Sequence, residues 1–213
     1  MIIILIGGPG AGKGTQSEIL EEQLQMVHVS SGDLLRDHVK RGTELGKAAD
    51  KYMSEGKLVP DKLVIDMIED RLLAPDTEHG VLLDGFPRTE PQARALDDAL
   101  DLKGRAVNMV LYINVDDETM IDRISGRLMC RKCGHIFHEK FMPPKVPGVC
   151  DECGSELYQR EDDTRETAIK RVASFHQQTK PIVEYYRSRG VLCEVDGSKP
   201  VEEVTSYLLS CLR

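Results

Sequence analysis

The sequence has no long hydrophobic run. Its longest apolar stretch is MIIILI, at residues 1–6, and glycines follow at once. A membrane-spanning helix needs about 20 apolar residues, and no positively charged stretch precedes this run as it would in a secretion signal. We therefore expect a cytoplasmic protein with no membrane partner.

An excess of basic charge is also missing. The 213 residues include 28 Lys and Arg against 36 Asp and Glu, which gives a net charge of −8. This balance argues against a broad basic face for nucleic acid, so no nucleic-acid partner is expected. With 40% hydrophobic and 30% charged residues, the composition is that of a globular protein, which excludes disordered and collagen-like classes.

Short apolar runs indicate the fold class. They occupy residues 2–6, 81–83, 107–113 and 191–195, and continuous runs of this kind are typical of strands buried on both faces. Helical patterns lie between them, for example around Ile19 to Leu24 and Val64 to Leu72. Strand and helix alternate, which predicts an α/β protein with a parallel sheet.

Several residues are expected at helix ends. Asp61 is a candidate N-cap, and Asp163 with Glu166 three residues later resembles a capping box. Pro181 should kink or restart a helix, and Pro200 suits the first position of the last helix.

Two segments interrupt the alternation. Residues 128–159 carry four cysteines and three prolines but few aliphatic residues, so this segment has too little apolar area for a core of its own. Residues 30–60 are polar and helical, and they separate the first strand from the next by more than one crossover requires. We interpret both segments as insertions.

A glycine-rich loop, GGPGAGKGT at residues 7–15, follows the first apolar run and precedes a helical pattern. Glycines allow backbone N–H groups to converge on phosphate oxygens, and Lys13 adds a positive charge. An ordinary glycine turn is the alternative. Phosphate-binding loops place Ser or Thr directly after the lysine, whereas this sequence has Gly14 and then Thr15, so a magnesium role for Thr15 stays open.

Four motifs in order resemble those of adenylate kinases, the long-lid bacterial type, over nearly the whole chain. They are GGPGAGKGT (7–15), SGDLLR (31–36), DGFPRT (84–89) and DRISGR (122–127). The resemblance implies a P-loop kinase with a five-stranded parallel sheet flanked by helices. It implies a core of residues 1–29, 61–121 and 161–213, a helical monophosphate-binding insertion at 30–60, and a zinc-binding lid at 122–160. It further implies transfer of phosphoryl from ATP to AMP, giving two ADP, with Mg²⁺, by a monomer.

The same resemblance assigns roles to residues. The catalytic group would be Lys13, Arg88, Arg123, Arg160 and Arg171. ATP would be bound by Gly10, Ala11, Gly12, Lys13, Gly14, Thr15, Arg123, Arg127 and Lys199. AMP would be bound by Ser31, Arg36, Lys57, Val59, Gly85, Arg88, Gln92, Arg160 and Arg171. Asp84 would reach the magnesium ion through water, and Asp162 and Asp163 would be hinge residues that pair with lid or core groups.

The residues alone also allow interpretations in which these side chains have no role in binding or catalysis. The arginines could be surface residues, Asp84 a strand-end turn residue, Ser30 with Asp33 a capping box, and Asp163 a helix cap. No Ser-His-Asp or paired-carboxylate arrangement is evident, which fits a reaction whose acceptor is already an anionic phosphate.

Four cysteines predict a metal site. Cys130 and Cys133, and Cys150 and Cys153, form two CxxC pairs separated by 16 residues, a spacing that suits a structural Zn²⁺ ion with four thiolate ligands. Iron, a redox dithiol, or His135 or His138 in place of one cysteine are the alternatives. The family resemblance supports zinc, and it also gives His138 and Arg131 positions near the nucleotide face of the lid.

The other two cysteines, Cys193 and Cys211, are expected to be buried small hydrophobes with reduced thiols. His28, His38, His79 and His176 have no partner pattern and are interpreted as surface or satisfied core residues.

Two other functions stay open. A kinase for another monophosphate, such as UMP or GMP, fits the same fold. A nucleotide-dependent module that grips nucleic acid through its cysteine ribbon would use Lys132, Lys140 and Lys145, although nearby acidic residues offset them.

Overall fold

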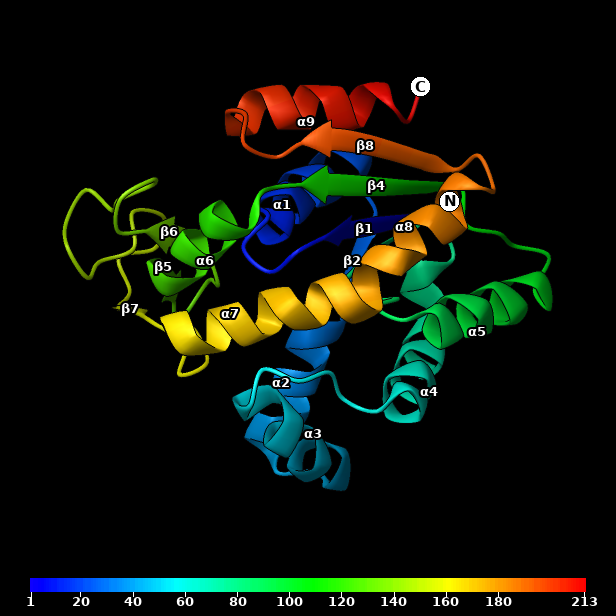
Figure 1. Cartoon of the computed structure of the whole chain (residues 1–213), viewed down its shortest axis with the longest axis horizontal. Helices are drawn as coiled ribbons and strands as arrows, with labels where there is room; N and C mark the ends of the chain where they lie inside the picture. Colours follow the sequence, from blue (N-terminus) through cyan, green and yellow to red (C-terminus); the bar gives the residue numbers. More distant parts are fainter.

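A five-stranded parallel sheet forms the centre of the molecule in the computed structural model, which describes residues 1–213 (Figure 1). The strand order is β2-β3-β1-β4-β8. The strands are β1 (Ile2–Gly7), β2 (Val27–Ser30), β3 (Val81–Asp84), β4 (Met109–Asn114) and β8 (Leu192–Asp196). The predicted parallel α/β sheet is confirmed. The short edge strand β2 has no long apolar run, which explains why the pattern of such runs does not reveal it.

Alternation along β1 divides the core into two layers. Ile2, Ile4 and Ile6 pack into one cluster of buried residues, and Ile3 and Leu5 pack into a second on the opposite face. Successive side chains of a strand point to opposite faces, so a run without polar residues suits a strand that is covered on both sides.

Helices cover both faces of this sheet (Figure 1). Residues of α1 (Lys13–Leu24) and α9 (Val201–Ser210) belong to the cluster that contains Ile3. Residues of α4 (Asp61–Leu72), α5 (Glu90–Asp101) and α8 (Lys180–Arg187) belong to the other. None of the helices has the length and apolar character needed to cross a bilayer.

The remaining elements extend from the carboxyl ends of the strands (Figure 1). A helical pair, α2 (Ser31–Arg41) and α3 (Glu44–Ser54), follows β2 directly. A separate antiparallel sheet of order β6-β5-β7 follows α6 (Asp117–Ser125). Its strands are β5 (Arg127–Cys130), β6 (Ile136–His138) and β7 (Leu157–Tyr158). After the small sheet, the chain returns to the central sheet through α7 (Arg165–Ser174). One short helical turn, Pro75–Thr77, lies elsewhere in the chain, just before β3.

Three helix ends differ from the sequence-based expectations. Pro60 is the N-cap of α4, so Asp61 is its first residue and its side chain caps nothing. Thr164 caps α7, and its hydroxyl accepts a hydrogen bond from the Thr167 N–H. Pro200 is the N-cap of α9 rather than its first residue. Pro181 restarts the helix, as expected. It lies in the first turn of α8, directly after a π-helical turn at Phe175–Thr179.

Cys193 and Cys211 are not buried free thiols. They form a disulfide that joins β8 to the end of α9, with 6.3 Å between their Cα atoms, and both residues are half-buried. The expectation was wrong because the sequence does not show that α9 folds back along the edge strand.

Candidate active site

The glycine-rich loop connects β1 to the first turn of α1. Gly10 has φ +80°, and a Cβ there would lie 2.5 Å from the Met120 carbonyl oxygen, so a side chain would be both strained and crowded. Lys13 lies over the loop, and its Nζ donates to the Gly7 and Gly8 carbonyl oxygens at 2.8 and 2.9 Å. Burial lowers the pKa of Lys13 to about 8.

Two adjoining pockets open at the carboxyl ends of the strands. The first is lined by α2, the segment from Met53 to Val59, and the start of α5. The second lies between the glycine-rich loop and the small antiparallel sheet. Four cationic side chains line both pockets and therefore stand at their junction: Lys13, Arg36, Arg88 and Arg171.

These cations are crowded and partly buried. Burial, and then the charge of Arg171, lowers the pKa of Arg88 to about 10. Burial, and then the charge of Arg36, lowers the pKa of Arg160 to about 10, and the Arg160 Nε has no hydrogen-bond partner although it is buried. Buried cations are costly unless an anion compensates them. The junction is therefore suited to a polyanionic ligand such as a chain of phosphates.

Asp163 connects the small sheet to α7 through hydrogen bonds with two arginines. It is fully buried, accepts a hydrogen bond from Arg127 Nε at 2.8 Å, and accepts another from Arg171 Nη1 at 3.2 Å. Asp162 also accepts from Arg171, at 3.3 Å. The cap expected at Asp163 is thus replaced by a pairing with arginines of β5 and α7, the alternative that the resemblance implied.

Asp84 ends β3 and lines the second pocket. Its Oδ2 lies 3.7 Å from Nε2 of His28. Burial opposes ionisation of Asp84, but His28 and Lys13 outweigh it and lower the carboxyl pKa. The charged carboxylate presents oxygen ligands beside the glycine-rich loop, which fits the preference of Mg²⁺ for oxygen. His28 Nε2 is buried without a hydrogen-bond partner, so His28 is neither a surface nor a satisfied core residue.

The first pocket has apolar walls and a few polar groups. Leu35, Val59 and Val64 are buried and line it. Ser31 Oγ donates to the Gly85 carbonyl oxygen at 2.6 Å, and Arg88 Nε donates to the same oxygen at 2.7 Å. A flat apolar molecule with an anionic end would suit this arrangement.

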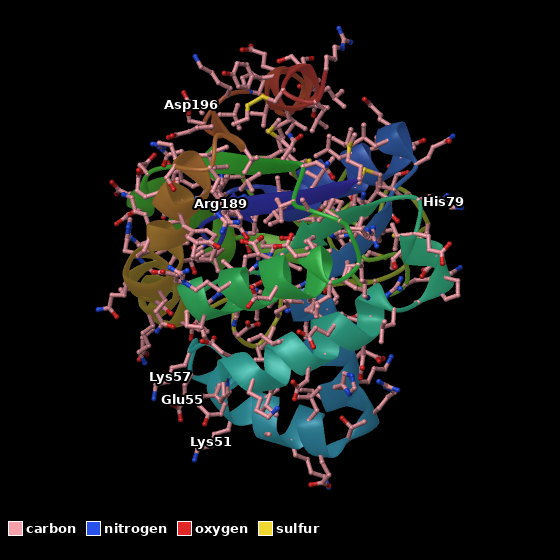
Figure 2. All side chains as sticks on the ribbon, turned by 90° about the vertical axis from the view of Figure 1, so that its right-hand side faces the viewer. Lys51, Glu55, Lys57, His79, Arg189 and Asp196 are labelled. Atoms are coloured by element: carbon pink, nitrogen blue, oxygen red, sulfur yellow. A yellow bond between two sulfur atoms is a disulfide. The ribbon has the colours of Figure 1, made fainter.

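Two residues expected to bind AMP are placed differently from the others. Arg160 lines only the second pocket. Lys57 lines the first pocket, but its Nζ pairs with Glu55 at 2.5 Å and its side chain is 67% exposed (Figure 2).

The second pocket brings together the residues expected to bind ATP. Gly10 to Thr15, Arg123, Arg127 and Lys199 all line it. Arg123 Nη1 donates to the Gly197 carbonyl oxygen at 3.0 Å. A Cβ at Gly14 would lie 2.8 Å from Cδ1 of Ile136, so the missing side chain after Lys13 makes room for the small sheet.

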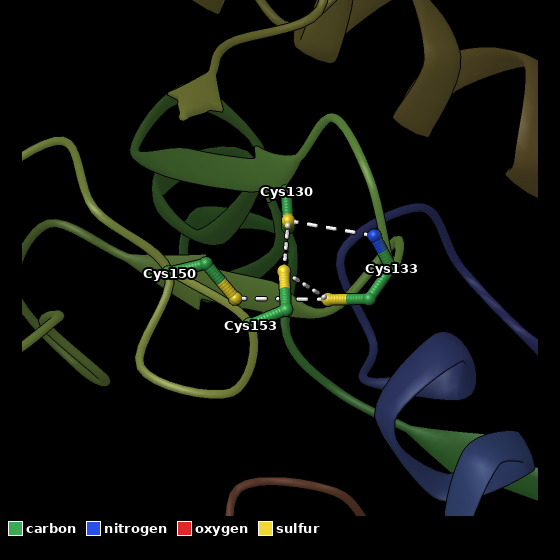
Figure 3. A group of neighbouring side chains, drawn as sticks. All are labelled: Cys130, Cys133, Cys150 and Cys153. Atoms are coloured by element: carbon green, nitrogen blue, oxygen red, sulfur yellow. Dashed lines mark hydrogen bonds between the residues drawn. The ribbon is translucent and has the colours of Figure 1, made fainter. Parts of the chain in front are cut away.

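The four cysteine sulfurs form a compact group (Figure 3). All four lie within 4.8 Å of one another. The Sγ–Sγ distances are 3.4 Å for Cys130–Cys153, 3.6 Å for Cys133–Cys150 and 3.5 Å for Cys133–Cys153. A tetrahedral zinc site with Zn–S bonds of about 2.3 Å needs S–S distances of about 3.8 Å, so the group fits.

Neither candidate histidine belongs to this group. His138 Nδ1 accepts from the backbone N–H groups of Lys140 and Phe141, at 3.0 and 3.1 Å, and Nε2 faces the Asp122 carbonyl oxygen at 3.1 Å. Both ring nitrogens are therefore engaged. His135 Nδ1 lies 3.6 Å from Glu18 of α1.

Comparison with known proteins agrees with this geometry. The family model described as adenylate kinase matches residues 5–191. An adenylate kinase from Caldicellulosiruptor bescii is 49% identical over 212 residues, covering 100% of this chain and 99% of the relative. One from Methanocella arvoryzae is 50% identical over 214 residues, with the same coverage. One from Streptomyces coelicolor is 48% identical over 214 residues, again covering 100% and 99%.

The chain belongs to the adenylate kinase family. The resemblance stated from the four motifs is thereby confirmed. Membership makes the protein a nucleotide-binding phosphotransferase, and its α/β sheet with a cysteine-bearing small sheet agrees with that membership.

The adenylate kinase motifs do not identify every residue of the two pockets. Five apolar residues between positions 129 and 142 line the second pocket: Met129, Ile136, Phe137, Phe141 and Met142. His138, which the resemblance placed near the nucleotide face, lines it too. One feature of the sequence could have indicated the apolar residues: they lie in a segment too small to bury them in a core of its own. Arg131, expected near the nucleotide face, instead pairs with Glu156 and lies over the Tyr158 ring, with Arg131 Cζ 4.5 Å from the ring centroid.

Proposed function

We propose that the protein transfers the terminal phosphoryl group of ATP to AMP, forming two ADP, by in-line displacement. One observation carries the proposal: Lys13, Arg36, Arg88 and Arg171 line both pockets and stand where these meet. Two nucleotides that occupied the pockets would bring their phosphates together at these cations.

Positioning and charge stabilisation are the proposed work of the site, because the acceptor phosphate is already an anionic nucleophile. ATP would occupy the second pocket, its phosphates held by residues Gly10 to Thr15 and by Arg123 and Arg127, with Lys199 beside it. AMP would occupy the first, its phosphate held by Arg36 and Arg88. Lys13, Arg88, Arg123, Arg160 and Arg171 would stabilise the transferring group.

Contacts to the AMP nucleoside are assigned in the same way. The expected set is Ser31, Lys57, Val59, Gly85 and Gln92, and all five contribute to the lining of the first pocket. For Lys57 the contribution would come from its backbone, because its ammonium group pairs with Glu55.

Mg²⁺ bound with ATP would neutralise phosphate charge at the reacting end, and Asp84 would hold it through water. A Zn²⁺ ion held by Cys130, Cys133, Cys150 and Cys153 would replace the missing core of the small sheet. Four thiolates fill its coordination, which leaves no open position for catalysis.

Three parts would move in the reaction: a core (1–29, 61–121 and 161–213), a monophosphate-binding insertion (30–60) and a lid (122–160). Contacts between them support a closed arrangement. Arg160 lies 3.8 Å from Asp33, and the lid residue His135 lies 3.6 Å from Glu18. Closure would exclude water, which would otherwise accept the phosphoryl group. The proposal also includes a monomeric cytoplasmic enzyme.

A panel of acceptors at fixed ATP and Mg²⁺ tests the substrate. AMP, UMP, CMP and GMP are compared by the rate of ADP formation, and we expect AMP to have the highest kcat/KM. A higher value for UMP or GMP would reassign the first pocket to another monophosphate kinase.

A further inference from the structure

The side-chain amide of Gln92 is held by its own helix end. Thr89 caps α5 and accepts from the Gln92 N–H at 3.4 Å, while Gln92 Oε1 accepts from the Arg88 N–H at 2.7 Å. Reciprocal bonds of this kind resemble a capping box. Because a backbone N–H can only donate, the atom that faces Arg88 must be the amide oxygen.

Asp61 holds the other end of the same amide. Its Oδ1 accepts from Gln92 Nε2 at 2.8 Å, across 31 positions of sequence. Asp61 is the first residue of α4 and caps no backbone group. A carboxylate only accepts hydrogen bonds, so the atom that faces Asp61 must be the amide nitrogen. Two partners of opposite kind therefore leave Gln92 one orientation.

Gln92 is 2% exposed and lines the first pocket, among the apolar side chains of Leu35, Val59 and Val64. Its amide retains one oxygen lone pair and one N–H. A carboxamide of this kind can pair with the amino group and the adjacent ring nitrogen N1 of adenine, accepting from the first and donating to the second. A 6-oxopurine has a carbonyl and a ring N–H in those places, and it would pair only with a flipped amide.

We propose that Asp61 is a positioning residue that makes the acceptor site select 6-aminopurine over 6-oxopurine monophosphates. It acts through Gln92, because a flip would turn the amide oxygen toward the Asp61 carboxylate and the amide nitrogen toward the Arg88 N–H. Both hydrogen bonds would be lost, and like groups would face each other. The inference rests on the proposed function, since it places the AMP base beside Gln92.

Kinetics with AMP and inosine monophosphate, which carries the 6-oxo group, test the inference. Asp61→Asn keeps the shape of the side chain but can donate as well as accept, so the Asp61 end no longer opposes the flip and only the Arg88 N–H still favours the original orientation. We expect the ratio of kcat/KM for AMP to that for inosine monophosphate to fall about tenfold, because the flip no longer loses the hydrogen bond to the charged Asp61 carboxylate. Asp66→Asn, on the exposed side of α4 beside Lys62, is the matched control and should keep the wild-type ratio.

A purely structural role of Asp61 would lower both rates together, and a double-mutant cycle separates the two cases. In a Gln92→Leu background, Asp61→Asn should leave the ratio unaltered. Asp61→Ser serves as a second variant, because its hydroxyl also donates and accepts and serine is favoured at helix starts. The inference is overturned if either folded variant keeps the wild-type ratio. Failure of the wild type to phosphorylate AMP would instead defeat the proposed function.

Discussion

At the scale of single residues, the site is a balance of buried charge. Lys13, Arg88, Arg160 and Arg171 all have lowered pKa values, and burial is the largest cause in each case. Their acidic partners, chiefly Asp162 and Asp163, pair with only part of this positive charge. Burying unpaired positive charge costs free energy in the protein without ligand, and phosphates bound at this place would supply the missing anions.

Substitution of Arg88 is the most direct test of the proposed role of these cations. Arg88→Ala removes a buried cation from the junction of the pockets, and we expect turnover to fall by about a hundred- to a thousandfold while the circular dichroism spectrum is retained. Arg94→Ala is the control, because Arg94 lies on the exposed side of α5 and pairs with Glu90. Wild-type turnover in the Arg88 variant would remove this residue from the proposed machinery.

Lys13 should make the rate of the reaction fall at high pH. Because the pKa of Lys13 in the free protein is about 8, the ammonium loses its proton above that pH and with it the charge that attracts phosphate. Since kcat/KM reports the free enzyme, its value for MgATP should fall above about pH 8. Lys13→Arg, if active, should move the fall to higher pH. A flat wild-type profile through about pH 9.5 would contradict the assignment.

At the scale of helices and strands, the sequence motifs predict local structure more reliably than the candidate helix caps do. The glycine-rich loop was placed correctly between a strand and a helix because its signal is local. The local pattern suggests caps at Asp61 and Asp163, because it does not contain their partners, Gln92 and Arg127, which lie 31 and 36 positions away. For Asp163, only the family resemblance implied the pairing. Such contacts depend on how elements pack, and a pattern along one element does not contain that information.

The small sheet should depend on its metal. Only four buried residues form its cluster, and two of them are cysteines, so zinc binding, worth on the order of 10 kcal/mol, would supply its stability. Chelation, or Cys133→Ser, should remove hydrogen-exchange protection from β5 to β7 while β1 and β4 stay protected. Lys132→Ala in the same turn should keep both the metal and the protection. An ordered small sheet in a protein shown by metal analysis to lack zinc and iron would refute this dependence.

The disulfide should stabilise α9. Cys193 and Cys211 are 18 residues apart, and closing a loop of this length is worth about 3 kcal/mol in the chain-entropy estimate. We expect reductant to lower the thermal midpoint of the wild type and to leave that of Cys211→Ser unaltered. Equal midpoints for the wild type with and without reductant would show that the bond contributes nothing.

At the scale of the whole molecule, the proposed function depends on three parts meeting at one place. The central sheet supplies the glycine-rich loop and Asp84, the helical pair supplies Arg36, and the small sheet supplies Arg127. The family resemblance predicted this set of residues and the parallel sheet. It did not predict the apolar residues between Met129 and Met142 that line the second pocket, or the disulfide, because both arise from packing between distant segments.

The most direct test of the account follows the phosphoryl group itself. The purified protein is incubated with Mg²⁺, AMP and ATP labelled at its terminal phosphate, and the products are separated. We predict two ADP for each AMP consumed, with the label in the terminal phosphate of ADP formed from AMP. Label released as inorganic phosphate, or ATP left intact in the presence of AMP, would contradict phosphoryl transfer between the two pockets.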